Sequence, residues 1–73
     1  MLDAFNEVQI YARKNYDGHF TLMSFTGNWR ACYGTIESRH AINYMISGTT
    51  AEEALKNLLN NPIDVYQIEQ KLG

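Results

Sequence analysis

Few residues of this chain combine the type and the spacing that chemistry requires. His19 and Cys32, the single cysteine, could supply a base and a nucleophile. Such a pair also needs a third group to orient the base, and none is identifiable. A free cysteine in a strand is more typically a small buried apolar residue. We therefore predict no catalytic residue and expect that the chain is not an enzyme.

Metal and cofactor chemistry have no better support in the sequence. Two histidines, His19 and His40, and one cysteine are too few for a closed zinc site. The sequence has no cofactor motif and no glycine-rich phosphate loop, so we expect no metal and no cofactor. We interpret Arg39 and His40, with Glu37 beside them, as a solvated turn.

The adjacent carboxylates Glu52 and Glu53 invite an acid–base role, but their position explains them structurally. Either Thr49 with Glu52 or Thr50 with Glu53 fits a capping box, in which a hydroxyl and a carboxylate satisfy exposed amides at the start of a helix. Carboxylates in a first turn also interact favourably with the helix dipole. We predict a helix start here and no metal ligand.

Aromatic side chains are the residues most typical of a binding surface. Trp29 and Arg30 belong to residue types that are common at binding hot spots, although Trp29 could instead close one end of the core while Arg30 stays solvated. Tyrosines are enriched at interfaces because they supply contact area with little loss of entropy. We expect at least one of the five to contact a partner: Tyr11, Tyr16, Tyr33, Tyr44 and Tyr66. The predicted partner-binding residues are Met23, Phe25, Trp29, Arg30 and Tyr44.

A helix is predicted from Asp3 to Tyr16. Apolar residues recur there at steps of three and four, which is typical of one face of a helix. Asp3 can cap its start and Gly18 can end it. The predicted apolar stripe consists of Leu2, Phe5, Val8, Ala12 and Tyr16.

The stretch "TLMSFTGNWRACYGT", from Thr21 to Thr35, predicts a hairpin with strands at Phe20–Phe25 and Trp29–Tyr33. A two-residue turn at Gly27 and Asn28 would place Leu22 opposite Tyr33. A three-residue loop would invert one strand relative to the other. The sequence leaves both registers open.

The remaining segments predict one more strand and two helices. Ile42, Tyr44 and Ile46 in "AINYMISG" alternate as in a strand. The segment "TTAEEALKNLLNN" predicts a helix that ends near Pro62. Its inward residues are Ala51, Leu55, Leu58 and Leu59. The tail, with Val65, Ile68 and Leu72, predicts a short last helix, with an edge strand as the alternative.

These elements predict one small domain over residues 1–73: a two-layer α+β fold with a three-stranded antiparallel meander, in the order αβββαα. The helices would cover one face of the sheet, and the other face would have nothing from its own chain to cover it. A core of this size seldom supplies more than about 3 to 5 kcal/mol without further support. We therefore expect a protein partner, either a second copy or a host protein.

Charge and composition limit the remaining classes of function. Six Lys and Arg against eight Asp and Glu give a net charge of −2, which argues against a nucleic-acid binder. The alternative stays open that sheet aromatics stack on bases while Arg13, Lys14, Arg30 and Arg39 contact phosphates. No stretch is apolar enough to span a membrane. The lone cysteine and the acidic start "MLDAFNEVQIYARK" predict a reducing cytoplasm.

The element order is similar to that of the double-stranded RNA-binding domain. That family holds phosphates with a lysine-rich start of its second helix, where this chain has "TTAEEALK". Its Pro-His loop between the first two strands is replaced here by "TGN". The resemblance therefore covers the topology without the binding motifs, and topology alone does not carry function.

A second resemblance covers Asp17 to Leu59. The segment "DGHFTLMSFTGNWRACYGT", followed later by "GTTAEEALKNLL", resembles small uncharacterised proteins of phages and prophages. The resemblance implies a bacterial or phage cytoplasmic setting and no known reaction. Small phage proteins often bind and block a host protein, so it also favours a protein-interaction module: a homodimer, an adaptor or an inhibitor.

Overall fold

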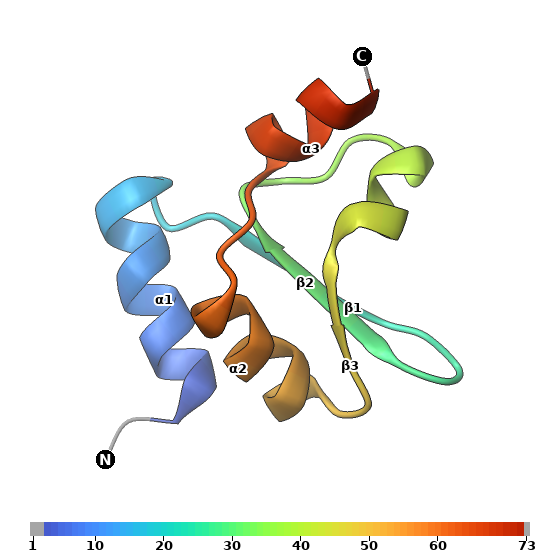
Figure 1. Ribbon diagram of the computed structural model, residues 1–73. Helices are drawn as coiled ribbons and strands as arrows, with labels where there is room; N and C mark the ends of the chain where they lie inside the picture. The colour runs from blue at the N-terminus through green and yellow to red at the C-terminus, as the bar shows by residue number, and fades with distance from the viewer. Residues whose placement is uncertain (1–2, 73) are drawn as a thin grey trace.

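The computed structural model describes residues 3–72 and confirms the mixed α+β fold with the order αβββαα. Its strands form one antiparallel sheet in the order β1-β2-β3. Helices α1 and α2 lie together on one face of this sheet (Figure 1). The elements are α1 (Ala4–Asn15), β1 (Phe20–Ser24), β2 (Trp29–Tyr33), the 3-10 helix η1 (Arg39–Tyr44), β3 (Ile46–Gly48), α2 (Ala51–Asn60) and α3 (Val65–Leu72).

Helix α1 begins and ends with the predicted residues. The Asp3 side chain accepts a hydrogen bond from the Asn6 amide at 2.9 Å, which satisfies one of the free donors of a first turn. Gly18, at a φ of +85°, donates its amide to the Ala12 carbonyl at 3.0 Å. A left-handed residue after the last turn is the usual way for a helix to end.

The apolar stripe of α1 is confirmed in part. Val8 and Ala12 are fully buried, as expected, and Ala4 joins them. Phe5 is 44% exposed and packs edge-on against Phe20. Leu2, the other predicted member near the start, lies outside the described residues.

The hairpin takes neither predicted register. Phe25 donates its amide to the Asn28 carbonyl at 2.8 Å, so the turn is centred on Thr26 and Gly27. Leu22 therefore pairs with Ala31, not with Tyr33. A shift of two residues leaves each side chain on its face, because strand side chains alternate with a period of two. The faces consequently match those of the two-residue turn.

The third strand is shorter than predicted, because residues Arg39–Tyr44 form the 3-10 helix η1 and only Ile46–Gly48 pair with β2. Tyr33 lies beyond this short ladder. Its amide donates to the Ile63 carbonyl at 2.9 Å, and it forms a parallel bridge with Asp64. The place beside β2 that a longer β3 would need is therefore taken by the segment before α3.

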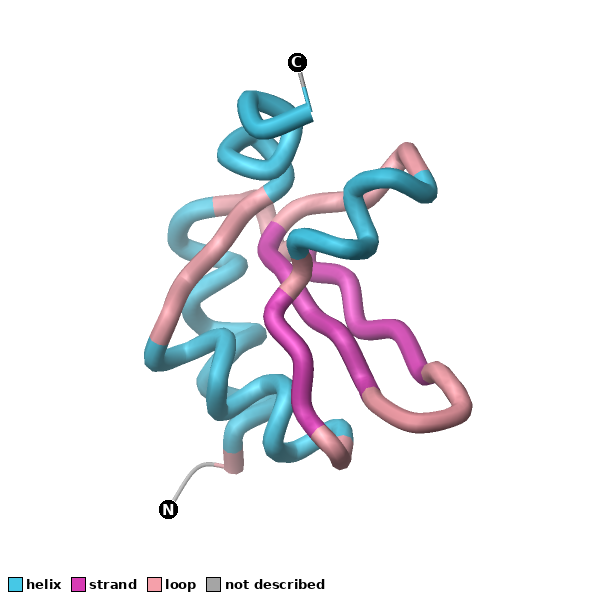
Figure 2. Tube along the Cα trace, turned by 45° about the vertical axis from the view of Figure 1, so that its right-hand side comes forward, coloured by secondary structure: helices cyan, strands magenta, loops and turns pink. Residues whose placement is uncertain are grey.

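One end of the second face of the sheet is covered by the chain itself, which corrects the expectation of a wholly uncovered face. Cys32 of β2 is fully buried there, in a cluster with Ala41, Met45 and Ile68. These residues belong to η1, the residue that follows it, and α3. Figure 2 shows η1 and α3 near the same end of the sheet. The hairpin turn lies away from that end.

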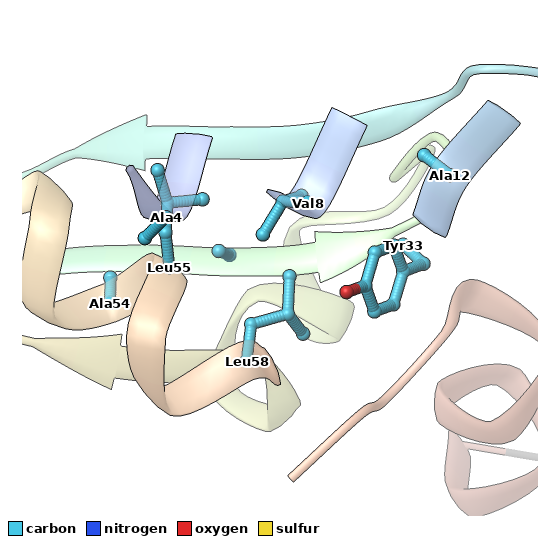
Figure 3. Packing of buried hydrophobic residues seen from close by; sticks show 8 residues of the cluster. Ala4, Val8, Ala12, Tyr33, Ala54, Leu55 and Leu58 are labelled. Atoms are coloured by element: carbon cyan, nitrogen blue, oxygen red, sulfur yellow. The ribbon is translucent and has the colours of Figure 1, made fainter. Parts of the chain in front are cut away.

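The main core lies between the sheet and the pair α1–α2. Val8, Leu55 and Leu58 from the helices pack with Ala31 and Tyr33 of β2, and Figure 3 shows Val8 and Leu58 pointing toward each other. Leu55 and Leu58 are core residues, as predicted, whereas Leu59 is half-buried. The helical interpretation of the tail is also confirmed, with Val65 and Ile68 buried in α3.

Two glycines allow close approaches between elements. Gly34 adopts a φ of +85°, and a Cβ there would lie 2.7 Å from Cγ1 of Val65. A Cβ at Gly48 would overlap the backbone of Ala54. These positions bring α3 against the end of β2 and α2 against β3.

Candidate functional site

Four of the five predicted partner-binding residues lie on or beside the second face of the sheet. Met23 pairs with Arg30 across β1 and β2, and Phe25 follows Met23 by two residues and so continues the same side of the strand. Tyr44 belongs to η1, which packs on this face. Phe25 and Tyr44 are each 39% exposed. We call Met23, Phe25, Arg30 and Tyr44, which extend along this face from the hairpin turn to η1, the hairpin-tip surface.

Arg30 holds this surface together. Its Nη1 donates to the Ile42 carbonyl at 3.2 Å, so a side chain of the sheet binds the backbone of η1. Met23 and Ile42 both pack against the cluster that contains Cys32. The guanidinium thus fixes the 3-10 helix that carries Tyr44.

Trp29 does not belong to the hairpin-tip surface. It pairs with Ser24 and Gly48 and packs against the main core beneath α1 and α2. Its neighbour Arg30 points to the opposite face, because successive strand residues alternate. The structure therefore separates two residues that the sequence suggested as one hot spot, and it places Trp29 at the core.

Lys71 is a member of this region that the sequence did not indicate. Its Nζ lies 5.7 Å from the centroid of the Tyr44 ring, within reach of a cation–π interaction. The contact joins α3 to η1. No local sequence pattern relates the two residues, so only the fold reveals that Lys71 borders the exposed Tyr44 ring.

The structure does not bring His19 and Cys32 together as a catalytic pair. Cys32 is fully buried, and this burial, with the nearby Asp64 charge, raises the pKa of its thiol to about 12. At neutral pH the group is a protonated thiol, which is a poor nucleophile. The His19 side chain is exposed and lines a different part of the molecule.

Glu52 and Glu53 both act as helix caps. Thr50 begins α2 and accepts the Glu53 amide at 3.0 Å, while Glu53 Oε1 accepts the Thr49 amide at 3.0 Å. Glu52 Oε1 accepts the amide of Ala4 at 3.1 Å and so caps α1, a contact that sequence spacing does not indicate. Within residues 3–72, no three His, Cys, Asp or Glu side chains are grouped so as to hold a metal ion.

A polar cleft of about 320 Å³ lies where the end of α1 meets α3 and the loop after β2. Beside it, the Tyr16 hydroxyl donates to Asp64 Oδ2. Burial and this hydrogen bond to a carboxylate raise the pKa of Tyr16. Besides Tyr16 and Tyr66, the charged or titratable residues that line the cleft are Asp17, His19, Glu37 and Glu69. Their positions in sequence are too scattered for a local pattern to relate them.

The five tyrosines divide between the core and the surface. Tyr33 is fully buried, with Tyr16 stacked on it at 5.2 Å and Tyr11 at 4.7 Å between ring centroids. Tyr44 is 39% and Tyr66 67% exposed. Tyr11, Tyr16 and Tyr33 thus belong to or border the core, and an interface role for at least one tyrosine stays a prediction.

No helix in the described part of the chain is long and apolar enough to cross a membrane. Comparison of the chain with protein-family models, with curated proteins and with solved structures finds no match.

Proposed function

We propose that the chain is a small non-enzymatic protein-interaction module that binds a partner protein through the hairpin-tip surface. The observation that supports this function is the exposure of Phe25 and Tyr44, each 39% exposed, on a surface that Arg30 fixes through its hydrogen bond to Ile42. Exposed aromatic rings on a rigid surface are favourable contact groups because they lose little entropy on binding.

The charges beside these rings indicate the chemistry of the partner. Lys71 lies over the Tyr44 ring, and Arg30 pairs with Met23, two residues before Phe25, so a complementary segment would carry apolar side chains next to a carboxylate. The cytoplasmic setting and the host-protein partner suggested by the resemblance to phage proteins belong to the same proposal.

A capture experiment with two matched variants tests this surface. Phe25→Asp places a charge at the exposed aromatic residue beside the hairpin turn, within the proposed contact. Tyr66→Asp places the same charge at a more exposed residue that lines the cleft beside Glu37 and Glu69 and does not belong to the hairpin-tip surface. A partner retained by the wild type and by Tyr66→Asp, but lost with Phe25→Asp, is the expected result.

Equal loss with both variants, or retention by both, would contradict the proposal. Trp29→Ala is a poor probe because Trp29 packs against the core.

An electrophoretic shift series tests the alternative of nucleic-acid binding. If the chain is a protein-interaction module, its few scattered cations should bind nucleic acid weakly and lose it as salt rises. Tight binding that survives ~150 mM salt would therefore favour the nucleic-acid alternative.

A further inference from the structure

A second surface, on α1, has a symmetrical arrangement of charge around an apolar centre. Glu7, Ile10, Tyr11 and Lys14 of α1, with Leu59 of α2, line a shallow groove of about 280 Å³. We call it the α1 groove. It lies on the helical side of the molecule, whereas the hairpin-tip surface belongs to the opposite face of the sheet.

The centre of the α1 groove is apolar and partly open to solvent. Ile10 and Tyr11 are each 38% exposed. Tyr11 packs with Tyr33 at 4.7 Å between ring centroids, so its ring is fixed by the core while its outer part stays accessible. Leu59 of α2 is half-buried beside them. A partner that covered this centre would remove apolar area from water.

The charges at the two ends of the groove are opposite. Glu7 lies three residues before Ile10, and Lys14 lies three residues after Tyr11, so the midpoint between Ile10 and Tyr11 is also the midpoint between the charges. Seven residues span about 10 Å along a helix and almost two turns, which keeps both charges on one face. They are too far apart to pair with each other.

This arrangement is self-complementary. We propose that a second copy of the chain occupies the α1 groove, with the two α1 helices antiparallel about a twofold axis that passes between Ile10 and Tyr11. Glu7 then faces the partner's Lys14, and Lys14 faces the partner's Glu7, while the apolar centres meet. Such an isologous contact is closed and stops at a dimer.

The antiparallel direction follows from the same charges. Two parallel α1 helices in register would place Glu7 against the partner's Glu7 and Lys14 against the partner's Lys14, and like charges in such contact repel. The proposal is independent of the hairpin-tip surface, which remains free in the dimer to bind another protein.

Sedimentation over a wide concentration range tests the dimer through charge reversal. Glu7→Lys and Lys14→Glu should each raise the dimer Kd by about tenfold or more, which corresponds to about 1.4 kcal/mol. The double variant, which exchanges the two charges, should bring the Kd back toward that of the wild type. Arg13→Glu is the matched control, because Arg13 is exposed in the same last turn but does not line the groove.

Ile10→Ser provides a second, uncharged variant that should also weaken the dimer, and circular dichroism checks that every variant keeps its helices. A wild type that stays monomeric at all concentrations would overturn the proposal. So would a double variant that fails to recover while the Arg13→Glu control dimerises normally. A dimer that survives the α1 changes but is lost with Phe25→Asp would place the interface at the hairpin tip instead.

Discussion

Tyr16 and Asp64 join the end of α1 to the start of α3: the Tyr16 hydroxyl donates to Asp64 Oδ2 over 2.7 Å. Asp64 also caps the start of α3. Its Oδ1 accepts the Gln67 amide at 2.8 Å, and Gln67 Oε1 accepts the Asp64 amide at 3.1 Å. One carboxylate thus serves a long-range contact and a helix cap.

Tyr16→Phe removes the donor and should lower the free energy of unfolding by roughly 1 to 2 kcal/mol, the scale of a partly exposed hydrogen bond to a charged group. Urea denaturation measures the change. Asp64→Asn is a second comparison: its single amide oxygen can accept only one of the two bonds, so it should keep the Gln67 cap or the Tyr16 contact but not both. A Tyr16→Phe protein as stable as the wild type would show that the two residues are close without stabilising the fold.

Tyr33→Phe, unlike Tyr16→Phe, should not lower the free energy of unfolding. The Tyr33 hydroxyl is buried with no hydrogen-bond partner among residues 3–72, and Figure 3 shows it pointing into the core toward Leu58. An unsatisfied buried hydroxyl costs about 1 to 3 kcal/mol, so its removal should leave stability unchanged or increase it. Thermal unfolding of the two tyrosine variants side by side checks the contrast, and a clear loss with Tyr33→Phe would contradict this account.

Stability should fall in alkaline solution. Burial raises the pKa of Cys32 from 9.0 to about 12 and that of Tyr33 from 10.0 to about 12. The unfolded chain therefore loses these two protons at a lower pH than the folded chain does. The two groups leave the free energy of unfolding unchanged below about pH 9 and lower it as the pH rises toward 12. Denaturation series between about pH 7 and about pH 11 measure the loss.

Cys32→Ala provides the control for this pH dependence. Without the thiol, the fall should begin closer to the ordinary tyrosine pKa of 10.0. An unchanged profile would assign the alkaline loss to other groups.

Leu58→Ala should destabilise the protein by about 2 to 5 kcal/mol, the usual result of emptying a buried leucine site. Leu58 is fully buried, whereas the adjacent Leu59 is only half-buried. Leu59→Ala should therefore cost clearly less. A shift of only a degree or two in the thermal midpoint of Leu58→Ala would be incompatible with its place in the core.

Thr50→Ala should weaken the fold by about 1 kcal/mol through loss of the N-cap of α2. The Thr50 hydroxyl accepts the Glu53 amide directly, whereas the Thr49 hydroxyl contacts the exposed Glu53 carboxylate at 3.2 Å. Thr49→Ala should accordingly have a smaller effect. Partner binding should persist in both variants, and its loss without loss of stability would identify this turn as a contact site.

The parts of the fold that the sequence predicts correctly depend on local chemistry. Asp3 and Thr50 cap helices through residues three positions away, and Val65 and Ile68 share a helical face with the same short period. Such signals act between neighbours and do not need the rest of the fold. The element order and the core position of Leu58 follow from them.

The incorrect expectations concern competition between distant segments. The alternation of Ile42, Tyr44 and Ile46 is typical of a strand, but the segment at Ile63 and Asp64 takes the adjoining place beside β2. Residues Arg39–Tyr44, which lose this place beside β2, form η1 instead, and η1 packs over Cys32 on the face that was expected to be open. For the candidate site, sequence alternation correctly groups Met23 with Phe25, but it does not reveal that Trp29 faces the helices.

The contacts of α1 also determine when it can form. Its first amide, at Ala4, binds Glu52, and its last turn is tied to Asp64 through Tyr16; each pair is 48 residues apart. A helix of 12 residues is marginal in water on its own. During synthesis α1 therefore emerges before the residues that hold its two ends, and a nascent chain that stalls before Asp64 leaves the apolar stripe of α1 without these partners and open to chaperones and proteases.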